Sequence, residues 1–317
     1  MRDVALLVAC AAVVVIGVRS APAGRTKVVM TASASAAPPP APLPSAAAAR
    51  PAAVTTELED TECSFADPGT GDSIKASAKP FVVWARMAAI RPDGSYDLLL
   101  HSHGGEAARR VLGQGLPMVL ATLDLGPLSG DYRGTFPDRR SFDRAIAAID
   151  KTVSDVVGRP AKADKIVISS FSAGYGAVAE ALAAVGQDGA PSGVILLDSL
   201  HASYRTGFEI EPTTLEPFLV YARRALEGRG YLALSHSAIR PPGYASTEEV
   251  ATFLLHTLAV EATPLEKPSG TGLTLTRLAR EKGFSVRGYT GQDKGAHCAH
   301  LELLPELLEG WRTERGR

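Results

Sequence analysis

The sequence predicts an α/β protein in which a mostly parallel central sheet carries helices on both faces. Segments rich in β-branched and aliphatic residues alternate with segments whose apolar residues recur at helical spacing. The run 193–200, GVILLDSL, is apolar along most of its length, as expected for a strand that is covered on both faces. Polar residues gather where several of these strands end, and ligands bind at that edge of such sheets.

The chain begins with two segments that are unlike the rest. Residues 4–18 form an unbroken apolar run, which suits the core of a signal peptide and is shorter than the ~20 residues that a spanning helix needs. Residues 20–56 consist mainly of Ala, Pro and Ser, so they bury too little apolar surface to offset the entropy of ordering. We therefore predict a signal peptide or N-terminal membrane anchor at 1–19, a disordered linker at 20–56 and a folded domain at 57–317.

The composition limits where the protein works and what it binds. The N-terminal run predicts export to the periplasm, the cell envelope or the medium, with residues 4–18 as a membrane anchor if they are retained. Under oxidising conditions Cys63 and Cys298 could pair, and two free buried thiols are the alternative. A hydrophobic content of 45% supports a sizeable core, whereas a net charge of −1 and an aromatic content of 6% argue against a nucleic-acid partner.

Strands and helices alternate through the folded domain, with turn residues between them. The stretch 165–182 is predicted to form a strand, a sharp turn and a helix, and 205–229 could form a small helical cap. The other predicted strands are 79–87, 96–102, 117–125, 193–200, 231–239 and 284–290. The other predicted helices are 138–157, 215–227, 247–260, 273–282 and 300–311.

The turn within 165–182, KIVISSFSAGYGAVAEAL, places Ser172 between a strand and a helix. This is the form of a nucleophile elbow, Gly-x-Ser-x-Gly, in which Ser170 takes the place of the first glycine. Small residues flank the serine because the strand and helix backbones pass close to each other there. The alternative is an ordinary strand-to-helix turn in which Ser172 caps the helix.

Further polar residues follow other predicted strands in a suggestive order. His103, Gly104 and Gly105 follow an early strand, and a histidine pair follows the last one. With the serine elbow between them, these motifs resemble the α/β-hydrolase superfamily, in the manner of serine esterases and lipases, over about 79–317. The resemblance implies an α/β-hydrolase fold and the cleavage of an ester through an acyl-enzyme intermediate.

The resemblance implies a role for each group in a catalytic triad. Ser172 is the expected nucleophile, His297 the expected base and Asp198 the expected acid. His300 is the alternative base because it lies three residues further along the same segment. Glu248 is the alternative acid because it follows a later predicted strand.

The resemblance also implies an oxyanion hole made of backbone amides. One donor is the amide of Ala173, which follows the nucleophile, and the other is that of Gly104 or Gly105. No cofactor or metal is expected, and the expected partner is a small-molecule, lipid or polysaccharide ester.

Other functions remain open at this point. The same triad can cleave amides, so an amidase or peptidase is one alternative. A non-catalytic binding protein is another, since Ser170 could leave the elbow slack. A metal-dependent hydrolase is the third, because histidines that follow predicted strands can bind metal. The histidines concerned are His101, His103, His201, His297 and His300.

Overall fold

The computed structural model describes residues 63–115 and 117–315. The predictions for 1–19 and 20–56, and the predicted domain start at 57, therefore lie outside the described residues. Among the helices of the described part, none combines the length and the apolar character needed to cross a membrane.

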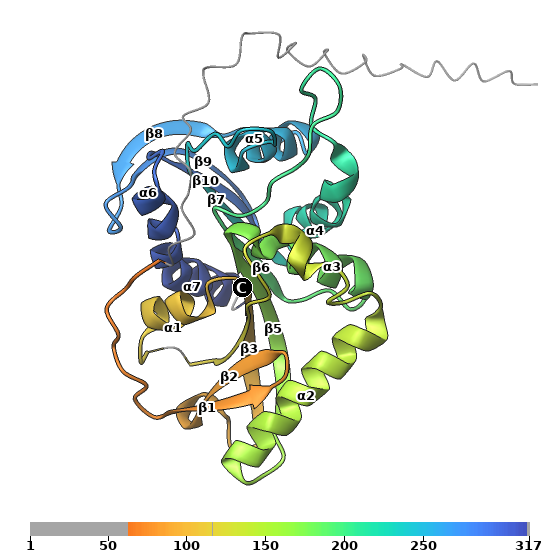
Figure 1. Cartoon of the computed structure of the whole chain (residues 1–317), viewed down its shortest axis with the longest axis vertical. Helices are drawn as coiled ribbons and strands as arrows, with labels where there is room; N and C mark the ends of the chain where they lie inside the picture. Colours follow the sequence, from red (N-terminus) through yellow and green to blue (C-terminus); the bar gives the residue numbers. More distant parts are fainter. Residues whose placement is uncertain (1–62, 116, 316–317) are drawn as a thin grey trace, which may run out of the picture. The chain divides into compact units, whose positions relative to one another are not determined.

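The described residues form one mixed sheet of ten strands (Figure 1). Its six central strands pair in parallel, and two strands at each end run antiparallel to their neighbours. Their order across the sheet is β1-β2-β4-β3-β5-β6-β7-β10-β9-β8. The strands are β1 (Ser73–Ala78), β2 (Phe81–Arg86), β3 (Ser95–Ser102), β4 (Val119–Leu123), β5 (Lys162–Phe171), β6 (Gly193–Leu197), β7 (Tyr231–His236), β8 (Thr263–Pro268), β9 (Thr274–Glu281) and β10 (Phe284–Tyr289).

Helices cover both faces of the sheet, which confirms the predicted α/β class (Figure 1). Four of them, α2 to α5, contribute to one hydrophobic core, and α1, α6 and α7 contribute to the other. The helices are α1 (Gly105–Leu112), α2 (Arg139–Val157), α3 (Tyr175–Val185), α4 (Glu216–Leu226), α5 (Thr247–Thr257), α6 (Lys294–Ala299) and α7 (Leu304–Arg315).

Strand β6 shows why its sequence is apolar without alternation. Val194 and Leu196 point into one core, whereas Ile195 and Leu197 point into the other, and all four side chains are fully buried. Successive side chains of a strand face opposite sides, so a strand between two helical layers needs an apolar residue at every position. Each such side chain contributes roughly 1.5–3 kcal/mol by leaving water.

The prediction of a helix at 273–282 is wrong. These residues form β9, which pairs antiparallel with β10 on one side and with β8 on the other. The sequence TRLAREK contains good helix formers, but the backbone partners that β10 and β8 supply outweigh this local preference. Besides β9, the strands and helices that the sequence did not predict are β1, α1, α6 and β8, which are short or lie at a sheet edge.

The helix predicted at 215–227 is confirmed as α4, but it forms no cap. Its side chains Phe218 and Ala222 are fully buried in the core, and the Tyr221 hydroxyl donates a hydrogen bond to the Pro191 carbonyl at 2.8 Å. Helix α4 therefore covers a face of the sheet, because its apolar stripe is used by the core.

The helix predicted at 300–311 is divided in the structure. Helix α6 ends at Ala299, a short 3-10 turn covers Leu301–Leu303, and α7 begins at Leu304. Leu304, Leu308 and Trp311 share the buried face of α7.

Cys63 and Cys298 form a disulfide across 235 residues of sequence. Of the two alternatives that the sequence left open, the structure has the paired one. Closing a loop of this length restricts the unfolded chain, and such bonds typically add about 2–4 kcal/mol to the free energy of unfolding.

Candidate active site

The carboxyl ends of the parallel strands bring three of the predicted site residues to one edge of the sheet. Ser172 directly follows β5, and Asp198 directly follows β6. His297 lies within α6, which follows β10, and not in a loop before a helix as the sequence suggested. Residues up to 125 positions apart in the chain thus lie at one edge of the sheet, because its parallel strands end there.

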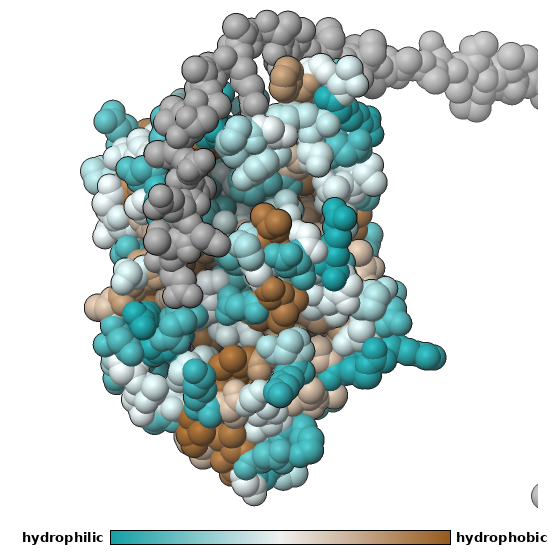
Figure 2. Space-filling model, viewed as in Figure 1, coloured by the Kyte–Doolittle hydropathy of each residue, from teal (hydrophilic) through white to brown (hydrophobic). Residues whose placement is uncertain are grey.

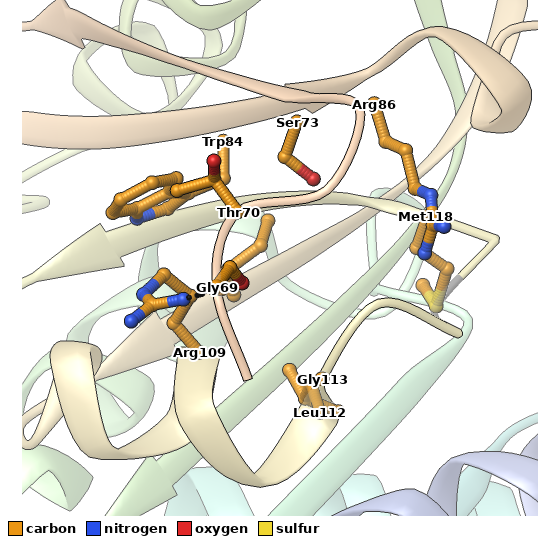
Figure 3. Close-up of a pocket in the computed structure, with 10 residues that line it drawn as sticks. Gly69, Thr70, Ser73, Trp84, Arg86, Arg109, Leu112, Gly113 and Met118 are labelled. Atoms are coloured by element: carbon orange, nitrogen blue, oxygen red, sulfur yellow. Dashed lines mark hydrogen bonds between the residues drawn. The ribbon is translucent and has the colours of Figure 1, made fainter. Parts of the chain in front are cut away.

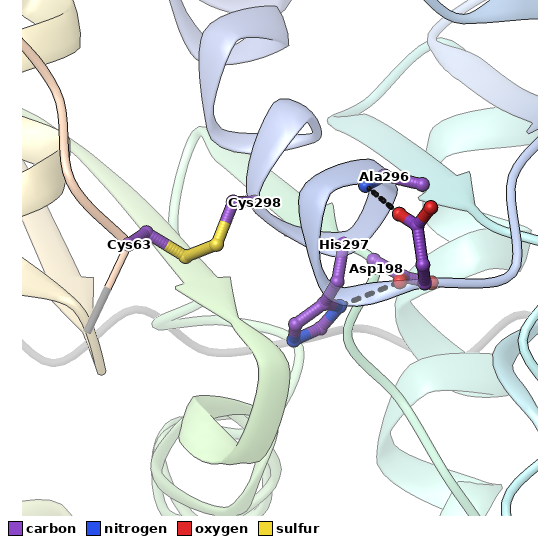
Figure 4. The surroundings of a disulfide bond; sticks show 6 residues. Cys63, Asp198, Ala296, His297 and Cys298 are labelled. Carbon is purple, nitrogen blue, oxygen red and sulfur yellow. Dashed lines mark hydrogen bonds and ion pairs between the residues drawn. A yellow bond between two sulfur atoms is a disulfide. The ribbon is translucent and has the colours of Figure 1, made fainter. Parts of the chain in front are cut away.

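Asp198, which is buried, and His297, which is partly buried, form a hydrogen-bonded pair (Figure 4). The Nδ1 atom of His297 lies 2.7 Å from the Oδ2 atom of Asp198. The other carboxylate oxygen accepts hydrogen bonds from the Ser237 amide at 2.9 Å and from the Thr247 hydroxyl at 2.6 Å. Both acceptor atoms of Asp198 are therefore occupied, as a buried carboxylate requires.

The surroundings keep Asp198 ionised. Burial by itself raises the pKa of this carboxyl. Two effects oppose burial: the positive charge that the His300 and His297 rings can carry, and the hydrogen bonds that His297 and Thr247 donate. Together they outweigh burial and hold the pKa of Asp198 well below its usual value. A carboxylate accepts the Nδ1 proton of His297, so Nε2 is the ring nitrogen left to take up a proton.

Ser172 is held in a strained turn. Its φ is +48°, in the left-handed region that costs a non-glycine residue about 1–2 kcal/mol. The turn Ser172–Gly174 then leads directly into α3. A Cβ at Gly174 would lie 2.0 Å from the Ser102 carbonyl oxygen, so this position has room for glycine alone. These features are those expected of a nucleophile elbow.

The hydroxyl of Ser170 has a defined place in this elbow. Ser170 is fully buried, and its Oγ atom lies 2.8 Å from that of Ser199. The Ser199 hydroxyl in turn lies 2.8 Å from the Ser172 carbonyl oxygen, to which it donates. The serine that replaces the first glycine thus belongs to a buried hydrogen-bond chain that supports the turn.

Backbone strain concentrates at this edge of the sheet. Seven non-glycine residues of the described ranges have a positive φ. Four of them follow β3, β5 or β6 on the candidate-site edge: His103 (φ +71°), Ser172 (φ +48°), Asp198 (φ +39°) and Leu200 (φ +102°). Such conformations persist where the surrounding structure enforces them, and they cluster at functional sites.

The Phe171 ring lies close to both the His103 ring and the His297 ring. Its centroid lies 4.3 Å from that of the His297 ring and 6.2 Å from that of His103. Phe171 immediately precedes Ser172, so the imidazole of His297 packs directly beside the serine turn. The hydrophobic ring also keeps this side of the imidazole away from water.

The glycines after β3 differ in what their amides contact. The Gly105 amide donates to the Asp124 carboxylate, with the nitrogen 3.2 Å from Oδ1. It is therefore engaged within the protein and fits an oxyanion donor less well than Gly104. Gly104 has a φ of +74°, which glycine adopts without strain, and it packs against the Phe171 ring. Ala173, the other predicted donor, is buried in the turn that follows Ser172.

His300 lies apart from the pair that Asp198 forms. Its ring is fully buried, and Nδ1 is hydrogen-bonded to the Ser235 hydroxyl at 2.9 Å. Burial lowers the pKa of His300 to about 4, so the ring is neutral at pH 7. Although His297 and His300 are three residues apart, they contact different groups because the helix ends between them.

Glu248, the alternative acid, points to a different partner. Its carboxylate pairs with Arg240 at 3.4 Å, and its backbone lies in the first turn of α5. The neighbouring residue Thr247 makes the contact with Asp198 instead.

The histidines considered as metal ligands do not lie together in one cluster. The described residues contain no group of three or more His, Cys, Asp or Glu side chains that could hold a metal ion. His101 bonds the Ser169 hydroxyl at 2.7 Å, His103 bonds the Tyr132 hydroxyl at 3.1 Å, and His201 donates to the Ala245 carbonyl at 3.0 Å. Their ring nitrogens thus serve separate local contacts.

Three supporting residues were not found from the sequence. Ser237 and Thr247 hold the Asp198 carboxylate, and Ser199 supports the Ser172 carbonyl. The polar stretch 236–248 after β7 was the only signal for the first two. Serine and threonine occur in many loops, and the partner that each one meets depends on loop conformation.

Comparison with known proteins finds distant structural similarities and no close relative. No protein-family model and no curated protein matches the chain. TT1662 from Thermus thermophilus is 14% identical, with 75% of this chain and 97% of that chain covered and a TM-score of 0.36. A protein described as an alpha/beta hydrolase fold protein of unknown function is also 14% identical, with 77% and 97% covered and a TM-score of 0.31. At these values neither likeness supports an inference about activity.

Substitutions of Ser170 and Ser199 should show that their two hydroxyl groups stabilise the elbow jointly. Ser199→Ala leaves the Ser170 hydroxyl and the Ser172 carbonyl without their partner, so it should lower the free energy of unfolding by about 1–3 kcal/mol. In urea unfolding, the double variant Ser170→Ala/Ser199→Ala should lose less than the sum of the single losses. Ser192→Ala is the control, because the Ser192 hydroxyl donates to the Ile166 carbonyl and takes no part in the elbow. Additive losses would refute the coupling.

Stability should depend on pH through the buried histidines. Burial lowers the pKa of His101, His236 and His300 to about 4 in the folded state, against about 6.5 in an unfolded chain. Between these values the unfolded chain binds more protons, so the free energy of unfolding should fall as pH falls from about 6.5 to about 4. Urea titrations should show a weaker dependence in His300→Gln and an unchanged one in the exposed His256→Gln. Equal slopes in both variants would contradict this.

Proposed function

We propose that the chain is a serine hydrolase that cleaves an ester through an acyl-enzyme intermediate. The observation that carries the proposal is the partly buried 2.7 Å hydrogen bond between His297 and Asp198, at the same edge as a serine in a left-handed turn. A serine hydroxyl is a weak nucleophile and needs a neighbouring base, which in turn needs an acid to orient it.

In the proposed mechanism Ser172 attacks the ester carbonyl carbon. The Nε2 atom of His297 takes the hydroxyl proton and then gives it to the leaving alcohol. Asp198 keeps the proton on Nδ1 and stabilises the imidazolium that forms. A water molecule, activated by His297 in the same way, then cleaves the acyl-enzyme and restores the serine.

The oxyanion that forms in each step is proposed to bind the amides of Ala173 and Gly104. We favour Gly104 over Gly105 because the Gly105 amide already donates to Asp124. A single donor of this kind typically stabilises the transition state by about 2.7–4 kcal/mol.

The substrate is proposed to be an ester with an apolar part. Large hydrophobic side chains are exposed at six described positions: Ile74, Met87, Leu125, Leu128, Phe208 and Tyr244. The last four lie in loops that follow β4, β6 and β7, at the edge of the sheet that carries the candidate site. Hydrophobic side chains on the visible face form separate patches rather than one broad surface (Figure 2). On this face they form no broad apolar surface of the kind that marks a large protein partner.

Two alternatives use the same site. An amidase or peptidase would employ the same groups, because the chemistry of acyl transfer is shared. A binding protein without catalysis was suggested by Ser170, but the buried bonds of that serine favour a well-supported elbow.

We also propose that the protein is exported. The apolar run 4–18 supports this, and so does the Cys63–Cys298 disulfide, since such bonds persist in oxidising compartments.

A fluorophosphonate probe tests the nucleophile. The probe should label the wild-type protein and should fail to label Ser172→Ala, because it reacts with an activated serine hydroxyl alone. Ser192→Ala, at the opposite end of β6, should label as the wild type does. Absence of labelling in folded wild-type protein would overturn the proposed function.

Paired substitutions test the base and the acid. His297→Ala and Asp198→Asn should each lower kcat for p-nitrophenyl acetate by about 10³-fold or more, because they remove the base or its orientation. The matched variants His300→Gln and Glu248→Gln should retain kcat within about 10-fold. If His300→Gln or Glu248→Gln instead abolished turnover in folded protein, the assignment would be wrong.

A further inference from the structure

Residues 63–70, here called the bridging segment, are held firmly although they form no helix or strand. Cys63 is bonded to Cys298 of α6. Towards the other end, the Arg110 side chain of α1 donates to the Phe65 carbonyl at 2.9 Å. Gln114, just after α1, donates to the Pro68 carbonyl at 2.7 Å.

Arg109 of α1 strengthens this attachment. Its guanidinium donates to Asp67 at 2.8 Å and to the Gly69 carbonyl at 3.2 Å, and its side chain is 8% exposed. The same guanidinium lies 5.0 Å from the Trp84 ring centroid, beside a cavity of about 30 Å³ (Figure 3). A buried cation that is paired and stacked in this way defines one position for the segment.

The two attachments are made to the elements that carry or directly follow two groups of the proposed mechanism. Cys298 follows His297 directly, and α1 begins at Gly105, immediately after Gly104. The strands that lead to these groups, β10 and β3, are not neighbours, because β5, β6 and β7 lie between them in the sheet. The bridging segment therefore connects the histidine helix to the glycine loop by a route outside the sheet. The disulfide and the contact with Asp198 leave α6 in different directions (Figure 4).

We propose that the bridging segment is a positioning element of the active site, whose disulfide fixes His297 relative to Gly104 and Ser172. This inference rests on the proposed serine hydrolase function. Helix α6 has six residues, too few to be stable by its own hydrogen bonds, so its position depends on external contacts. These contacts include the Asp293 cap, the Asp198 bond and the disulfide.

Opening the disulfide should therefore change kcat more than KM. A shift of a catalytic group by about 1 Å can slow a reaction by about 100-fold, whereas substrate contacts on other loops persist. We expect kcat to fall by about 10-fold or more, with KM changed by less than about 3-fold.

The test uses the full chain with the substitution Cys10→Ser, so that Cys63 and Cys298 are the two cysteines that remain. Hydrolysis of p-nitrophenyl acetate is measured for oxidised, reduced and reoxidised protein, with near-UV circular dichroism as the check of folding. We expect reduction to lower kcat and reoxidation to restore it. The variant Cys63→Ala/Cys298→Ala should match the reduced protein and should not respond to reductant. An unchanged kcat in reduced, folded protein would overturn the inference.

A second variant decides the matter if the reduced protein unfolds. Arg110→Gln keeps the disulfide and removes the guanidinium that holds the Phe65 carbonyl. It should lower kcat by several-fold at constant KM, whereas Arg312→Gln, which removes an exposed arginine of α7, should not. Equal activity of the two variants would overturn the inference. Inactive oxidised wild-type protein would instead refute the proposed function itself.

Discussion

The buried carboxylate of Asp198 is the group on which the candidate site depends. It accepts hydrogen bonds from the His297 ring, the Ser237 amide and the Thr247 hydroxyl, so it joins α6 to the end of β7 and the start of α5. An ionised carboxylate can be buried only where its oxygens are hydrogen-bonded. The contacts that hold the pKa of Asp198 low also fix the orientation of His297, so the electrostatics and the geometry of the site have one common cause.

The serine turn is supported in a comparable way by groups outside it. Ser172 occupies a left-handed conformation, and Gly174 touches the Ser102 carbonyl so closely that no side chain fits. The Ser199 hydroxyl supports this strained backbone by donating a hydrogen bond to the Ser172 carbonyl oxygen, and the Ser170 hydroxyl is hydrogen-bonded to that of Ser199. Strain of about 1–3 kcal/mol is tolerable here because two hydrophobic cores hold the strands on which the turn is built.

The N-terminal part of the described chain contributes to the same edge from outside the sheet. Its disulfide reaches the helix that carries His297, while α1 side chains bind the rest of the bridging segment. Parallel strands fix the ends of neighbouring loops, but they leave loops on distant strands free to move independently. A covalent link between such loops is therefore an efficient constraint on a site assembled from both.

The sequence by itself determined the α/β class, most strands and helices, and the edge at which Ser172, Asp198 and His297 meet. It could do so because apolar periodicity records which faces are covered, and parallel strands end together. It could not identify β9, whose helix-forming residues become a strand once β10 and β8 offer backbone partners. The tertiary structure alone decided between His297 and His300 and between Asp198 and Glu248 as hydrogen-bonding partners. These candidates have similar chemistry, and burial and distance, which arise when the loops pack, distinguish them.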